Sequence, residues 1–209
     1  MALAACSANG EWEPEFEQAT ANLSASARLA ACAKDPRVQA GLVSQTICAG
    51  ADIFFRETFE GNGRTCGSCH PASNNMTVDA PFINALHQSN PSDPLFVFET
   101  DPNLSMLETG QIFNGGILEN VDDFGDPTHK FVHRSVPHVL SLATSLKPDP
   151  NDDTTDPPHE RTGWSGDGAP GNGTLREFLT GAVEQHFPKT LARVAGVDFR
   201  VPTSQELDL

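Results

Sequence analysis

The chain has 209 residues, and its 28 acidic and 13 basic side chains give a formal net charge of −15 at pH 7. This length fits one domain with at most a small appendage. The acid excess leaves no basic stripe for a phosphate backbone or anionic lipid headgroups, and no apolar run approaches the ~20 residues that span a bilayer. Composition therefore excludes nucleic-acid binding and a transmembrane helix.

The balance of glycine, proline and aromatic residues indicates the fold class. The 17 Gly and 16 Pro residues predict short elements joined by many ordered turns rather than long regular sheets. The 13 Phe and two Trp residues supply apolar surface for a core, and the absence of Tyr excludes phenol chemistry. We expect a mainly α-helical domain with long ordered loops.

The first residues resemble the end of an export signal. Leu3-Ala4-Ala5-Cys6 is similar to the end of a bacterial lipoprotein leader, in which Cys6 becomes the lipidated first residue. The alternative is a gene-start artefact that contains Cys6. We expect a leader remnant here and a lipid anchor at Cys6.

Two helices are expected before residue 49. The segment from Glu15 to Ala33 contains no Gly or Pro and predicts one helix, and the segment Val38–Thr46 predicts a second. Cys32 and Cys48 lie sixteen residues apart. A disulfide between them would stabilise the fold by ~3 kcal/mol in the chain-entropy model. In an oxidising compartment we expect this disulfide to staple a helical hairpin, the alternative being two buried free thiols.

The next segment carries the most specific motif of the chain. Residues 49–60 place Phe55 and Phe59 on one helix face at i, i+4 spacing, ahead of Gly61. They lead into Cys66-Gly67-Ser68-Cys69-His70, which has the CxxCH spacing of a c-type haem attachment site. Two thiols at this spacing reach the two vinyl groups on one porphyrin edge, and the adjacent imidazole reaches the iron. The motif predicts one covalent haem c, with His70 as an iron ligand.

Three other interpretations of the CxxC pair are weaker. A thioredoxin-like motif needs a βαβ context, whereas the residues before Cys66 indicate a helix and those after it a loop. A structural zinc site needs four ligands in paired clusters, and the remaining cysteines form no second CxxC. A purely structural disulfide leaves the adjacent His70 unexplained.

Helices and acidic loops alternate after the motif. Apolar spacing predicts helices over Ala80–Gln88 and Asn103–Phe113, the second containing Met106. The acidic stretches Glu119–His129 and Asp149–Glu160 predict surface loops. Neither stretch has the EF-hand pattern, so solvated loops are favoured over calcium sites.

The C-terminal region predicts one strong helix and one weak one. Thr174 and Glu177 have the spacing of a capping box. The helix that follows carries an apolar face of Leu175, Phe178, Leu179, Ala182 and Val183. Residues 202–207 resemble a helix start that is too short for stability in isolation, so we expect a chain truncated at its C-terminus.

Three segments together resemble the bacterial di-haem cytochrome c peroxidase superfamily. They are the helix and motif ending at His70, the run from Arg134 through Pro137 to Leu140, and the run from Gly163 through Trp164 to Gly168. In that family an Arg-x-x-Pro segment and a Trp/Gly/Asp loop wrap the haem, so the resemblance implies a cytochrome c-like domain over residues 49–209 with haem contacts at Arg134 and Trp164. Those peroxidases need two haems, whereas this chain has one CxxCH motif, and relatives with a Tyr ligand are excluded because Tyr is absent.

The second axial ligand of the iron stays open among several side chains. His133 is the first candidate, because the resembling proteins bring their chain past the iron near the segment that begins at Arg134. Met106 is the main alternative, although a Met among apolar neighbours is often core filler. Further alternatives are His129, His138 and an open site, whereas Met76 lies too close to His70 in sequence to reach the opposite face.

Two side chains are candidates for the haem propionates. A guanidinium suits carboxylate geometry, so Arg64 is expected to pair with a propionate, the alternative being a surface arginine. Trp164 is expected to donate its indole N–H to a propionate or to pack on the ring.

These features favour a mono-haem electron carrier outside the cytoplasm, either periplasmic or extracellular. Residues 1–48 form the leader remnant and stapled hairpin, and residues 49–209 form the haem domain. A second axial ligand closes the iron to peroxide, and the acidic surface steers the protein to a basic redox partner. The alternatives are a domain of a peroxidase-like multi-haem enzyme and a haem-bearing subunit of a larger complex.

Overall fold

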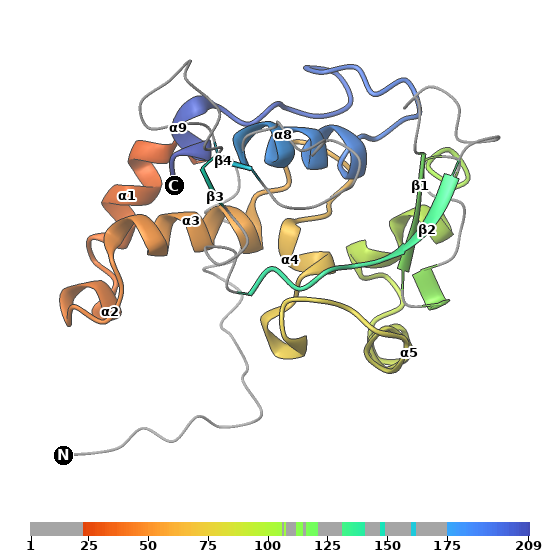
Figure 1. Ribbon diagram of the computed structural model, residues 1–209, viewed down its shortest axis with the longest axis horizontal. Helices are drawn as coiled ribbons and strands as arrows, with labels where there is room; N and C mark the ends of the chain where they lie inside the picture. Colours follow the sequence, from red (N-terminus) through yellow and green to blue (C-terminus); the bar gives the residue numbers. More distant parts are fainter. Residues whose placement is uncertain are drawn as a thin grey trace.

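The computed structural model describes residues 23–105, 107, 112–114, 116–120, 131–140, 147–148, 160–161 and 175–209 (Figure 1). Over these residues the chain is mainly helical, as the composition predicts, with two short antiparallel strand pairs, β1 with β2 and β3 with β4. The helices are α1 (Ala25–Cys32), α2 (Pro36–Gln39), α3 (Gln45–Arg56), α4 (Cys66–Cys69), α5 (Ala80–Ser89), α6 (Val97–Thr100), α8 (Leu175–His186) and α9 (Ser204–Leu207). The strands are β1 (Gly116–Asn120), β2 (Phe131–Ser135), β3 (Lys147–Pro148) and β4 (Glu160–Arg161).

Serine side chains start the two longer helices of the N-terminal region. Ser24 Oγ accepts the Ala27 N–H at 3.2 Å at the start of α1, and Ser44 Oγ accepts the Ile47 N–H at 3.0 Å at the start of α3. Both hydroxyls satisfy N–H groups that have no partner within the helix. The helix expected from Glu15 to Ala33 therefore begins only at Ala25, and residues 15–22 lie outside the described part of the chain.

The second helix expected in this region, over Val38–Thr46, is wrong. The chain forms the single turn α2, reverses at Gly41 with φ +70°, and starts α3 at Gln45. A left-handed φ is readily adopted by glycine, so Gly41 allows the reversal that separates the two helices.

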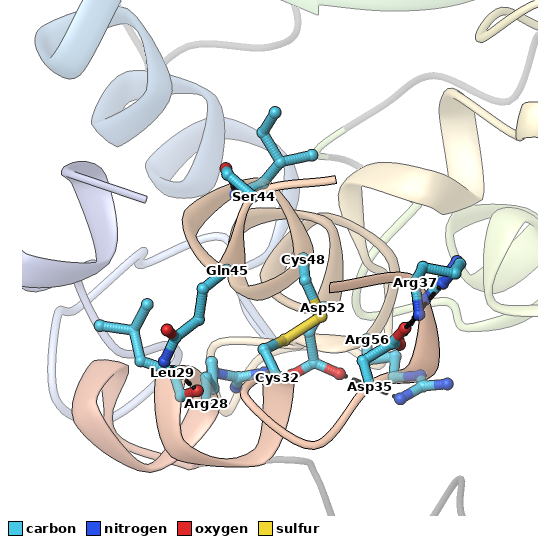
Figure 2. Close-up of a disulfide and its surroundings, with 11 residues drawn as sticks. Arg28, Leu29, Cys32, Asp35, Arg37, Ser44, Gln45, Cys48, Asp52 and Arg56 are labelled. Atoms are coloured by element: carbon cyan, nitrogen blue, oxygen red, sulfur yellow. Dashed lines mark hydrogen bonds and ion pairs between the residues drawn. A yellow bond between two sulfur atoms is a disulfide. The ribbon is translucent and has the colours of Figure 1, made fainter. Parts of the chain in front are cut away.

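A disulfide joins α1 to α3, as the spacing of the two cysteines predicts. Cys32 and Cys48 are bonded, with their Cα atoms 5.8 Å apart. Figure 2 shows the bond between the facing sides of the two helices. Gln45 Nε2 also donates to the Leu29 carbonyl at 2.7 Å across the same contact. The boundary expected between residues 48 and 49 falls inside α3.

α3 ends at Arg56, earlier than the pattern over residues 49–60 predicts. Phe59 and Glu60 adopt left-handed backbone, with φ 49° and 53°, and Glu57 Oε1 accepts the Phe59 N–H at 2.9 Å. The expected shared helix face of Phe55 and Phe59 is therefore wrong. Phe59 is buried, whereas Phe55 is 40% exposed.

Two helices were predicted between the CxxCH motif and the acidic loops, and the described residues form one of them. α5 confirms the helix predicted from Ala80, and Asp79 caps it by accepting the Phe82 N–H at 2.8 Å. The helix expected over Asn103–Phe113 is not formed by its described residues. Asp101 Oδ1 accepts the Asn103 N–H at 2.8 Å and closes a turn, and a separate 3-10 turn spans Ile112–Asn114.

The acidic stretches are only partly described. Glu119 and Asn120, expected at the start of a loop, belong to β1 and pair with Val132 and Phe131 of β2. Glu160, expected at the end of the second loop, belongs to β4. The other residues of both stretches lie outside the described part.

Two hydrophobic clusters form most of the core. We call them the α5 cluster and the C-terminal cluster. The α5 cluster comprises Val78, Ile83, Leu95, Phe96, Ile112 and Val136. The C-terminal cluster comprises Ile53, Phe59, Val183, Phe187 and Phe199. In the view of Figure 1, α4 lies between α8 above it and α5 below it.

The C-terminal helices agree with their sequence signals. α8 confirms the predicted helix, and Val183 of its apolar face is buried, whereas Thr174 lies outside the described residues. α9 is a single turn closed by a capping box, in which Thr203 N–H donates to Glu206 Oε2 at 2.8 Å and Glu206 N–H donates to Thr203 Oγ1 at 3.2 Å.

Candidate functional site

The CxxC residues form the short helix α4. Its start is held by Ser68, whose Oγ accepts the Thr65 N–H at 3.0 Å, and its end by the His70 N–H, which donates to the Cys66 carbonyl at 2.9 Å. One helical turn separates Cys66 from Cys69, so both side chains leave the same face. The two cysteines form no disulfide with each other, so both side chains are thiols.

α4 bridges the two hydrophobic clusters. Cys66 packs against the C-terminal cluster and Cys69 against the α5 cluster. Burial raises the pKa of the Cys66 thiol to about 12, and the neighbouring Cys69 acts in the same direction. The folded chain therefore holds Cys66 as a neutral thiol on an apolar surface.

Gly67, between the two cysteines, allows α3 to approach α4 closely. A Cβ atom at this position would lie 2.6 Å from Phe55 Cδ1. The side chain of Phe55, which was expected to share a helix face with Phe59, thus contacts α4 instead.

His70 is held in one tautomer. Its Nδ1 lies 2.9 Å from the Met76 carbonyl oxygen, which can only accept, so Nδ1 carries the proton and Nε2 carries the lone pair. Burial lowers the pKa of His70, and the nearby His186 lowers it further. The carbonyls of Met76 and Pro137 raise it but do not cancel the effect of burial. Burial thus favours the neutral imidazole, and the hydrogen bond of Nδ1 leaves the lone pair on Nε2.

Arg64 is a buried residue, so its alternative as a surface arginine is wrong. The side chain is 1% exposed, donates from Nη2 to the Leu95 carbonyl at 2.6 Å and from Nε to the Pro94 carbonyl at 3.1 Å. Its guanidinium lies 4.0 Å from the centroid of the Phe98 ring. Arg64 lies two positions before Cys66, and its hydrogen bonds connect this part of the chain to the α5 cluster. Its pairing with a propionate stays a prediction.

The structure describes only some of the other predicted site residues. His133 and Arg134 lie in β2, where only the backbone is described. Cys6, Met106, His129 and Trp164 lie outside the described residues. His138 is exposed, and its Nδ1 lies 2.8 Å from the Asn75 carbonyl oxygen.

The structure brings the segment after β2 beside the residues that follow His70. Thr77 Oγ1 donates to the Val136 carbonyl, next to the bond between His138 and Asn75. The segment of residues 134–140, singled out by its resemblance, thus lies against residues 75–77. Sequence reasoning missed the carbonyls of Asn75 and Met76, and the tolerance of Asn for left-handed backbone was the one available signal.

The donor set fits a covalently attached haem. Two thiols leave one face of α4, and the adjacent imidazole carries its lone pair on Nε2. Two vinyl groups and one iron require this set of groups. In the described part of the chain, no three His, Cys, Asp or Glu side chains gather as a metal site of their own. Nor does that part contain a helix long and apolar enough to cross a membrane.

No family model, no curated protein and no solved structure matches this chain.

Proposed function

We propose that this protein transfers single electrons by means of one covalently bound c-type haem, attached at Cys66 and Cys69 and ligated by His70. The observation that carries the proposal is the geometry of α4 and the residue after it, where two thiols and an imidazole with a fixed tautomer lie together. A haem held in this way supplies a one-electron change at its iron.

The chain's own residues hold the group and shield it. Cys66 and Cys69 would hold the haem through two thioether bonds, each made by adding one S–H across one vinyl double bond, with no leaving group. The α5 cluster and the C-terminal cluster supply apolar surface beside both sulfur atoms. In this proposal the helical domain and its ordered loops wrap one haem, with Arg64, Arg134 and Trp164 among its contacts.

The proposal keeps the resemblance to one haem domain of the bacterial di-haem cytochrome c peroxidase superfamily. His133 would hold the iron together with His70, and Met106 is the alternative to His133. Either side chain would close the iron to peroxide, which favours electron transfer over catalysis.

The proposed location is outside the cytoplasm, in the periplasm or beyond it. The disulfide between Cys32 and Cys48 supports this, because such bonds persist in oxidising compartments. The net charge of −15 favours a redox partner with a basic docking surface.

The first test is haem attachment itself. The protein would be expressed in a host with a cytochrome c maturation system and weighed after denaturation. We expect the mass of the polypeptide plus one haem, and loss of that haem in the double variant Cys66→Ser and Cys69→Ser. The matched control is Cys32→Ser with Cys48→Ser, which also removes two sulfur atoms and leaves the motif intact. A colourless wild-type protein with the polypeptide mass would overturn the proposal.

The second test separates a carrier from an enzyme. A low-spin ferric spectrum that does not change with peroxide or carbon monoxide supports the carrier. A high-spin ferric haem with peroxide turnover would instead identify a peroxidase-like enzyme. Replacing His133 by Ala should convert the low-spin spectrum to high-spin, and an unchanged spectrum moves the ligand assignment to Met106.

A further inference from the structure

Two consecutive residues after the attachment motif have left-handed backbone although neither is glycine. Asn75 has φ 57° and Met76 has φ 58°. Such a conformation costs about 1–2 kcal/mol per residue, and it persists where the surrounding structure determines it. Asn is among the residues that tolerate it, whereas Met is not.

The carbonyl oxygens of these two residues each meet an imidazole. The Asn75 carbonyl lies 2.8 Å from Nδ1 of His138, and the Met76 carbonyl lies 2.9 Å from Nδ1 of His70. The two histidines are far apart in sequence, and the turn brings them to neighbouring peptide groups.

Both peptide groups are bonded at both ends. The peptide between Asn75 and Met76 donates its N–H to the Pro71 carbonyl at 3.0 Å and accepts from His138. The peptide between Met76 and Thr77 donates its N–H to the Asn74 carbonyl at 3.2 Å and accepts from His70. The orientation of the second carbonyl is thus coupled to that of the first through the Met76 backbone.

A further bond fixes the segment that carries His138. Thr77 Oγ1 donates to the Val136 carbonyl, so His138 is presented to Asn75 from a strand end anchored two residues before it. The chain after β2 therefore contacts the Asn75–Met76 turn through His138, whose side chain is exposed.

We propose that the left-handed Asn75–Met76 turn, locked by His138, is a positioning device that holds the His70 ring with its proton on Nδ1, so that the lone pair stays on Nε2. The inference rests on the proposed function, in which Nε2 of His70 binds iron. Asn75, Met76 and His138 are positioning residues, because they act only through His70. This assigns His138 a role other than that of second axial ligand.

The first experiment uses the haem-free chain, so that it stands apart from haem attachment. Nitrogen-15 NMR of the histidine side chains should show His70 in the Nδ1–H tautomer, with a slowly exchanging Nδ1 proton. In His138→Ala we expect that proton to exchange on the order of 5-fold faster, the factor that corresponds to one hydrogen bond of about 1 kcal/mol. His138→Asn can place an amide N–H near the position of Nδ1 and should restore slow exchange. An unchanged His70 signal in His138→Ala would overturn the proposal.

A matched pair of variants at residue 75 tests the backbone geometry. Asn75→Gly keeps the carbonyl and adopts positive φ without strain, so the His70 signal should stay as in the wild type. Asn75→Val places a β-branched side chain where φ is positive, and it should accelerate exchange of the His70 proton. Identical behaviour of the two variants would show that the left-handed turn does not position His70.

The second experiment uses the haem-loaded protein. A hydrogen bond from Nδ1 makes an imidazole a stronger donor to iron and favours the ferric state. His138→Ala should therefore shift the reduction potential to a more positive value while the spectrum stays low-spin, and His138→Asn should shift it less. Conversion to high-spin would identify His138 as an iron ligand and overturn the positioning role. Absence of haem in the wild type would instead overturn the proposed function and leave the NMR result standing.

Discussion

Burial controls the reactivity of Cys66 at the scale of a single residue. Its pKa is raised from 9.0 to about 12, chiefly by desolvation. At pH 8 this lowers the thiolate population by roughly 10³ relative to an exposed cysteine, since each pKa unit is a factor of ten. Only the thiolate is a strong nucleophile.

Alkylation of the haem-free chain tests this shift. The rate for Cys66 in the folded chain should keep rising with pH up to about 12, whereas in urea it should level off above about 9. The rates are read by mass analysis after iodoacetamide treatment at a series of pH values. Matching profiles in the two states would contradict the burial of this thiol.

Arg64 contributes to stability through its position. Removing its guanidinium leaves the buried Leu95 carbonyl without this donor, whereas the Pro94 carbonyl keeps the Val97 N–H as a second donor. We expect Arg64→Met to lower the free energy of unfolding by about 1–3 kcal/mol, because a buried carbonyl that loses its hydrogen-bond donor costs about this much. The measurement is urea unfolding of the haem-free chain. Arg37→Met is the control, since Arg37 is exposed, and a similar loss in both variants would contradict the role assigned to Arg64.

At the scale of elements, the disulfide holds α1 against α3. Its loop closes over a sequence separation of 16 residues, which predicts a loss of ~3 kcal/mol when the bond is removed. Replacing Cys32 and Cys48 by Ala should lower the urea midpoint, whereas Cys66→Ala, which removes no bond, should lower it less. Reduction of the disulfide in the wild type should lower the urea midpoint as much as the double variant does. If neither change lowers the midpoint, the disulfide does not stabilise the fold.

Local signals predicted the elements that local chemistry determines. Apolar spacing predicted α5 from Ala80, and the spacing of Cys32 and Cys48, together with an oxidising compartment, predicted their bond. Element ends set by distant partners were not predictable. α3 stops at Arg56 because Glu57 turns its carboxylate to the Phe59 N–H and to Arg28, which lies 29 residues earlier.

The candidate site shows the same division. Cys66, Cys69 and His70 follow from their spacing, because the chemistry of attachment needs neighbours in sequence. The support of His70 by Met76, Asn75 and His138 could not be predicted, since it depends on a tertiary contact across 63 residues.

At the scale of the whole molecule, buried charges join segments from both halves of the chain around Glu57. Arg28 contacts Glu57 and Asp52, and Arg200 Nη2 lies 3.2 Å from Glu57 Oε1. Arg200 also pairs with Glu206 at 2.7 Å. α1, α3 and the C-terminal residues thus share one network, and the side chains of Arg28 and Glu57 are fully buried.

Removing the charge of the Glu57 carboxylate should therefore lower the free energy of unfolding. Glu57→Gln leaves the buried Arg28 guanidinium with less negative charge around it, and breaking a buried ion pair costs about 3–5 kcal/mol. Thermal and urea unfolding of the haem-free chain measure the loss. Asp35→Asn is the matched control, because it breaks an exposed pair with Arg37 and should change stability little. Equal effects of the two variants would show that the network does not join the segments energetically.

The charge of the whole chain predicts how the proposed carrier meets its partner. With a net charge of −15, attraction to a basic redox protein should accelerate encounter at low salt. The screening length falls from about 30 Å at 0.01 M to about 10 Å at 0.1 M salt, so the bimolecular electron-transfer rate should fall steeply over this range. Stopped-flow mixing with a basic redox protein measures the rate, and a neutral small-molecule reductant, whose rate should barely change with salt, is the control. A rate with the basic protein that is flat or rises with salt would mean that the acidic surface does not guide docking.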